Sequence, residues 1–65
     1  MNFEYDKEAD AAYIYLEATI KEGEAKNTIE VNDNIILDFD AEGKLLGIEI
    51  LNASKVLSKK TLVSA

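Results

Sequence analysis

The stretch NIILDFDAEGKLLGIEIL, residues 34–51, decides the fold because two apolar, alternating runs flank a short polar segment. In that segment, Asp40 and Gly43 stand where a type I turn followed by a left-handed residue prefers them. Alternation with a period of two is typical of strands. The stretch therefore predicts a β-hairpin that turns at residues 40–44.

The register of this hairpin decides which side chains share a face. A turn at this place sets Phe39 opposite Leu45 and Asp38 opposite Leu46. Strand residues alternate between faces, so we expect two apolar sets, which are Ile35, Leu37, Phe39 and Leu45 on one face and Ile36, Leu46, Ile48 and Ile50 on the other. A sheet that is apolar on both faces needs cover on both.

The same alternation continues upstream of the hairpin, where β-branched and aromatic residues favour strands. Further strands are predicted at residues 2–5, 12–17 and 28–31. The polar segments between them are rich in Asp, Asn, Glu and Gly and are predicted as turns or loops.

Downstream of the hairpin, Asn52 is predicted to cap a helix over residues 53–60 that turns Val56 and Leu57 toward the sheet. The fold class is therefore α+β, a small antiparallel β-meander of four to five strands with a short C-terminal helix packed on one face. We expect residues 1–65 to form one small domain, with residues 58–65 as a tail whose conformation the sequence leaves undecided between a strand and a frayed end. One short helix leaves much apolar surface uncovered, so a homodimer is expected to bury the second face.

Composition excludes many kinds of chemistry. The 65 residues include 13 acidic side chains against seven lysines, a net charge of −6, and no Arg, His, Cys, Pro or Trp. Without His and Cys there is no zinc finger, disulfide framework or His-based catalytic triad, and we predict no cofactor. The negative charge opposes nucleic-acid binding. No apolar run approaches the roughly 18 residues of a membrane span and no signal peptide begins the chain, so a cytoplasmic protein is expected.

A calcium loop is one interpretation of the turn. Asp38, Asp40, Glu42, Gly43 and Glu49 have the spacing of EF-hand ligands around a glycine turn. An EF-hand needs a helix on each side, however, and both flanks here alternate as strands. The hairpin is also expected to place Asp38 and Glu49 on opposite faces. The ordinary hairpin turn is the favoured interpretation, and no metal site is predicted.

Carboxylates are the remaining candidates for chemistry. Asp6 and Asp10 lie in the first polar turn, and Asp38 and Asp40 lie at the hairpin. Paired carboxylates perform general acid–base catalysis when one of them is desolvated. Solvated acidic turns are the simpler interpretation, and so short a chain has little room for a walled pocket. We therefore assign no catalytic residue, and the sequence leans against an enzyme.

Apolar and aromatic residues of the sheet are the candidates for contact with a partner, because tyrosines are enriched in protein interfaces. They are Tyr13, Tyr15, Ile36, Leu46 and Ile48. The predicted function is a non-enzymatic protein-interaction module that self-associates or binds a protein partner. The alternative is a small acidic ligand-binding domain or a carboxylate-based enzyme.

Two runs of this sequence resemble a known family. Residues 5–14, YDKEADAAYI, are similar to the Tyr-Asp-x-Glu-Ala-Asp-Ala-x-Tyr-Ile motif of a small prokaryotic family, the domain of unknown function numbered 2283. The second hallmark is ILDFD, EGK, GIEIL and AS, between residues 36 and 54. The resemblance covers about residues 3–57. It departs at Tyr15, where Arg or Lys is common, and at Asn52, where Asp is common.

This resemblance implies a stand-alone small domain of bacteria and archaea. The family has no assigned activity, so the resemblance supplies no catalytic or binding residues. Some members are encoded beside small toxin-like proteins, which implies an antitoxin-like role in binding a protein partner.

Overall fold

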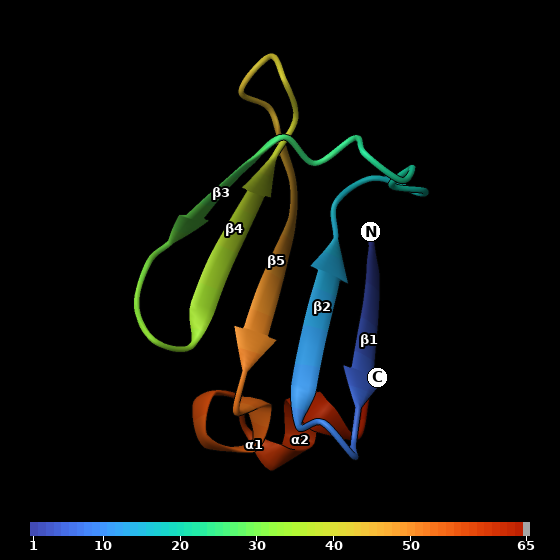
Figure 1. Cartoon of the computed structure of the whole chain (residues 1–65). Helices are drawn as coiled ribbons and strands as arrows, with labels where there is room; N and C mark the ends of the chain where they lie inside the picture. The colour runs from blue at the N-terminus through green and yellow to red at the C-terminus, as the bar shows by residue number, and fades with distance from the viewer. Residues whose placement is uncertain (65) are drawn as a thin grey trace.

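The computed structural model describes residues 1–64, which form one antiparallel sheet and two short helices (Figure 1). The strands are β1 (Asn2–Asp6), β2 (Ala11–Tyr15), β3 (Asn27–Glu30), β4 (Ile35–Phe39) and β5 (Leu45–Leu51), and the helices are α1 (Ala53–Val56) and α2 (Lys59–Leu62). The predicted α+β class, with an antiparallel sheet and C-terminal helical cover, is confirmed.

The strand order is β1-β2-β5-β4-β3, which differs from that of a continuous meander. The chain leaves β2 through residues 16–26 and crosses to the far edge, where β3 begins, so that β5 returns between β4 and β2 (Figure 1). At seven residues, β5 is the longest of the described strands. Because β5 lies in the centre of the sheet, its backbone is hydrogen-bonded to a strand on each side. The polar strands β1 and β3 form the two exposed edges of the sheet.

A β-bulge changes the register of the β4–β5 hairpin. Phe39 pairs with Leu45 as predicted, but Asp38 pairs with Gly47, and the register shifts between Asp38 and Phe39. The pairing predicted between Asp38 and Leu46 is therefore wrong. Because one extra residue moves every later side chain to the other face, the two predicted faces of β5 are exchanged beyond the bulge.

The pairing of all five strands defines two faces. The helix-side face carries Phe3, Tyr5, Ala12, Ile14, Ile29, Ile35, Leu37, Ile48 and Ile50. The open face carries Glu4, Asp6, Ala11, Tyr13, Tyr15, Thr28, Glu30, Ile36, Asp38, Gly47 and Glu49. Ile36 lies on the open face, whereas Ile48 and Ile50 lie on the helix-side face, so the prediction that these three share a face is wrong. Only one face is strongly apolar.

Two single-turn helices replace the one helix predicted over residues 53–60. Leu57 is extended between them, and the Ser58 side chain accepts a hydrogen bond from the Thr61 backbone at the start of α2. Asn52 precedes α1 in a left-handed conformation and makes no side-chain cap; its side-chain amide instead donates to Asn34. No helix of residues 1–64 is both long and apolar enough to cross a membrane.

The core lies where the helices meet the sheet. Ala12, Ile50 and Ala53 are buried together, and the predicted contacts Val56 and Leu57 pack against them. Both helices lie beneath the end of the sheet formed by β1, β2 and β5, while β3 extends away from them (Figure 1). The helical cover of the helix-side face is therefore incomplete, and Ile29 on β3 stays 53% exposed.

Candidate functional site

Asp10 joins the first turn to the C-terminal helices. Its carboxylate accepts hydrogen bonds from the Tyr5 hydroxyl at 2.7 Å, the Ser54 hydroxyl at 2.7 Å and the Ser54 backbone amide at 2.9 Å. Its backbone carbonyl accepts from the Ala53 amide at 2.8 Å. These bonds favour the ionised form, so Ser54 first and then Tyr5 hold the pKa of Asp10 below its ordinary value. The Asp10 carboxylate thus stabilises the fold by linking the first turn to α1.

Tyr13 makes a second long-range connection, on the open face. Its hydroxyl donates to Asp38 at 2.7 Å, and the Thr28 hydroxyl donates to the other oxygen of the same carboxylate at 3.0 Å. Tyr13 therefore reaches from β2 across β5 to β4. A Cβ atom on Gly47 would lie 2.5 Å from the Tyr13 ring, so only glycine leaves room for the ring at this place in β5.

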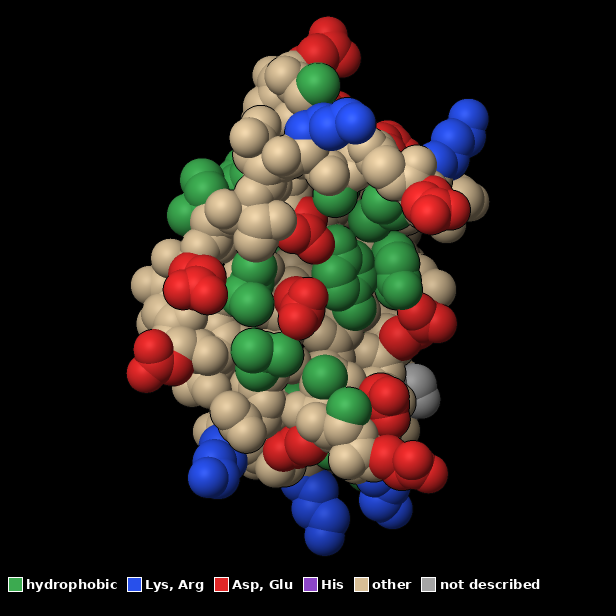
Figure 2. Space-filling model, viewed as in Figure 1, with side chains coloured by type: hydrophobic (Ala, Val, Ile, Leu, Met, Phe, Trp, Pro, Cys, Tyr) green, Lys and Arg blue, Asp and Glu red, His purple; other side chains and the backbone are tan. Residues whose placement is uncertain are grey.

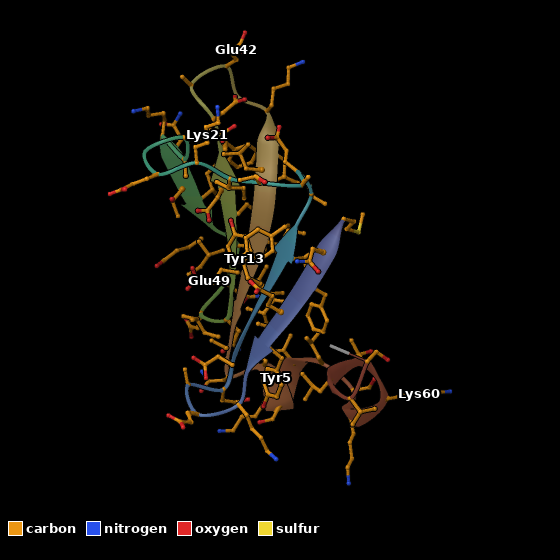
Figure 3. All side chains as sticks on the ribbon, turned by 90° about the vertical axis from the view of Figure 1, so that its right-hand side faces the viewer. Tyr5, Tyr13, Lys21, Glu42, Glu49 and Lys60 are labelled. Carbon is orange, nitrogen blue, oxygen red and sulfur yellow. The ribbon has the colours of Figure 1, made fainter. Side chains whose placement is uncertain are left out.

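The two tyrosines of β2 form an aromatic pair on this face. The ring centroids of Tyr13 and Tyr15 are 4.6 Å apart with the planes tilted by 52°. They line a shallow hollow of about 250 Å³ together with Glu4, Asp6 and Glu49. Figure 3 shows Tyr13 and Glu49 on the side of the sheet away from the helices, and Figure 2 shows this face with acidic and apolar side chains interleaved.

All three tyrosines of the chain have pKa values raised above the ordinary 10.0. For Tyr13 the chief cause is burial, followed by the bond to Asp38. For Tyr15 it is a hydrogen bond to Glu4, and for Tyr5 the hydrogen bond to Asp10. In each case a neighbouring carboxylate opposes formation of a phenolate.

We expect Gly47→Ala to displace the Tyr13 ring and break its bond to Asp38. In the wild type, the ultraviolet absorbance of phenolate should develop only above pH 10. In the variant, one of the three tyrosines should titrate closer to its ordinary pKa. A raised pKa in the folded state stabilises the fold below pH 10, and this stabilisation is lost as the pH rises through the folded value. A Gly23→Ala control adds the same Cβ in a loop, at a φ of 79° that strains the backbone but with no neighbouring atom within 4 Å. The same titration shift in both variants would point to general destabilisation and contradict the role of Gly47.

The remaining acidic candidates shape turns. Asp6 accepts from the backbone amides of Glu8 and Ala9 at 3.1 and 3.3 Å. Asp40 accepts from those of Glu42 and Lys44, both at 2.9 Å. Asp6 and Asp40 thus bind the backbone of their own turns, whereas Asp10 and Asp38 bind distant residues, and the structure does not gather the four into one site.

The bulge also changes the geometry considered for calcium. Asp38 pairs with Gly47 and Ile36 pairs with Glu49, which places Asp38 and Glu49 on the same face. The prediction that they lie on opposite faces is wrong. Even so, no three acidic side chains in residues 1–64 converge closely enough to hold a metal ion.

The residues predicted to contact a partner lie on different faces of the sheet or in the core. Tyr13, Tyr15 and Ile36 lie on the open face, whereas Ile48 lies on the helix-side face. Leu46 is 0% exposed, so it stabilises the fold and no partner can contact its side chain.

Sequence reasoning missed Ser54, Gly47 and Thr28 as partners of the predicted residues. A glycine inside a strand pattern is a sign of a bulge or a close approach, and Gly47 carried that sign. Ser54 lies 44 residues from Asp10, and no local pattern joins them.

Comparison with known proteins places this sequence in a family. Residues 2–54 match the family described as protein of unknown function, DUF2283. An uncharacterised protein of Methanocaldococcus jannaschii is 40% identical over 58 residues, which cover 89% of this chain and 46% of that relative. The chain thus spans about half the length of the curated relative it matches. No solved structure matches. The matched region contains the Asp10 and Tyr13 networks, from Tyr5 to Ser54, and the chain belongs to the DUF2283 family.

Proposed function

We propose that this protein is a non-enzymatic interaction module that self-associates through its helix-side face. The observation that carries the proposal is one apolar residue from every strand, aligned in direct cross-strand pairs. The row is Phe3, Ile14, Ile48, Leu37 and Ile29. Such a row forms a continuous apolar band across the sheet.

The helices leave this row partly uncovered. Ile29 is 53% exposed, and Phe3, Ile14, Leu37 and Ile48 are only half-buried. A second hollow, of about 320 Å³, opens beside Phe3 and Ile14 next to Leu57. Contiguous apolar surface of this kind is typical of interaction sites, and a second copy supplies the same chemistry in a self-complementary form.

Charge favours this face over the other for self-association. Every acidic residue that belongs to a strand lies on the open face by register; they are Glu4, Asp6, Glu30, Asp38 and Glu49. With a net charge of −6, two copies repel each other most where these carboxylates would meet. Two copies that meet through the uncovered part of the helix-side face, near Leu37 and Ile29, keep these carboxylates apart.

The proposal extends to a partner other than a second copy and to the place where the protein acts. The antitoxin-like role implied by the family resemblance would use the same apolar row to hold a protein partner. The absence of cysteine supports a reducing compartment, and we place the protein in the cytoplasm.

Self-association is tested with Ile29→Lys. We expect light scattering to give twice the monomer mass for the wild type and the monomer mass for the variant at the same concentration. A charge buried in an apolar contact is costly, so the dissociation constant should rise at least about tenfold. Lysine on an exposed edge strand is well tolerated in the monomer.

Val63→Lys is the matched control, because it also replaces an exposed apolar residue with lysine, at 74% exposure and outside the sheet. It should leave the wild-type mass unchanged. A monomeric wild type at the highest soluble concentration would overturn the proposal, and so would equal dissociation of both variants.

A further inference from the structure

We propose that the open face binds an extended, basic segment of a partner protein, one rich in arginine or lysine. This goes beyond self-association, which uses the opposite face, and either proposal can fail without the other.

The charged side chains of the strands are all negative, and they share one face. The strand carboxylates all lie on the open face, as described above. All seven lysines lie outside the strands, in turns, the loop before β3 and the helices. Figure 2 shows acidic side chains across the middle of this face, and both basic and acidic ones at its two ends. The middle of the open face is thus negative and carries no lysine, which attracts a cationic partner.

The aromatic pair adds specific contacts for such a partner. The rings of Tyr13 and Tyr15 lie 4.6 Å apart and share their hollow with Glu4 and Glu49. A guanidinium or ammonium group placed over a tyrosine ring gains a cation–π contact, and a carboxylate beside it pairs with the same charge. The Tyr13 hydroxyl is already hydrogen-bonded to Asp38 at 2.7 Å, so the ring loses little conformational entropy when a partner binds.

The spacing of the carboxylates favours a polypeptide over a small cation. No three acidic groups of residues 1–64 converge on one point, so they do not chelate an ion. Instead Glu4, Glu49, Asp38 and Glu30 come from four different strands, β1, β5, β4 and β3. From β1 to β3 the sheet spans four strand spacings, about 19 Å. An extended chain with several positive side chains matches this row of separate negative charges.

The test is a titration of the full chain with a hexa-arginine peptide. Calorimetry measures the dissociation constant, and the chemical shifts of the backbone amides show which residues the peptide contacts. We expect the shifts to map to β2, β4 and β5 around the open face. Glu4→Gln combined with Glu49→Gln should weaken binding about fivefold, because each exposed ion pair contributes modestly. The matched control, Glu8→Gln with Glu42→Gln, removes the same charge from two exposed turns and should change binding less than about twofold.

A second pair of variants tests the aromatic contact. Tyr15→Leu should weaken binding about threefold, while Tyr15→Phe, which keeps the ring, should bind like the wild type. Equal loss from the two glutamine pairs would show unspecific charge attraction and overturn the proposal. Shifts confined to the turns, or equal affinity for spermine, would also overturn it, the latter in favour of a polyamine.

Discussion

Replacing Leu46 with alanine is expected to lower the free energy of unfolding by about 3 kcal/mol, as for other large-to-small changes in a core. Leu46 is 0% exposed and is the largest fully buried side chain in the described residues. A domain of this length has a total stability of roughly 3–10 kcal/mol, and its core is small. The variant should therefore lose a large fraction of its stability and unfold at a clearly lower urea concentration than the wild type, which urea titration monitored by circular dichroism would show.

Leu45→Ala is the matched control for this result. Leu45 is the chain neighbour of Leu46 and pairs with Phe39 beside the bulge, but it is only half-buried. The same substitution there should cost about 1 kcal/mol. Both proteins must be compared at one concentration, because self-association would add to the apparent stability. Equal losses at the two positions would contradict the bulged register that buries Leu46.

The bulge also explains which part of the fold the sequence could predict. The turn at residues 40–44 was predictable because its signals are local: Asp40 caps the turn through two backbone amides, and Gly43 adopts a φ of 84°. The register beyond it was not, because Leu45 and Leu46 are both apolar and alternation does not show which of them faces the core. One extra residue then exchanged the predicted faces.

Strand order and the side-chain networks depended on contacts between distant parts of the chain. Nothing in residues 16–26 signals that the chain crosses to the far edge before β3 begins. The bond from Tyr13 to Asp38 spans 25 residues and depends on space left by Gly47. The hydrogen bonds of Asp10 and Asp38 likewise join residues that lie far apart in the sequence, which no local pattern could show.

Asp10→Asn is expected to lower the melting temperature at pH 7 by roughly 5–10 °C. Asp10 has a positive φ of 51°, which asparagine also tolerates, so the backbone is not the cause. The loss comes from the carboxylate, which accepts three hydrogen bonds from Tyr5 and Ser54. A neutral amide weakens these bonds because they are no longer assisted by a negative charge, and its NH2 group only donates, so the Ser54 hydroxyl has to turn round and accept.

The pH dependence identifies the carboxylate as the cause. The folded state holds the pKa of Asp10 below its ordinary 3.8, so the ionised group stabilises the fold above about pH 4, and this stabilisation is lost as the pH falls through the lowered pKa. The difference in melting temperature between wild type and Asp10→Asn should therefore be constant near neutral pH and shrink in acid. Asp33→Asn makes the same charge change in the exposed β3–β4 turn and should show neither effect. If Asp33→Asn destabilises as much, net charge is responsible and Asp10 does not join the first turn to α1.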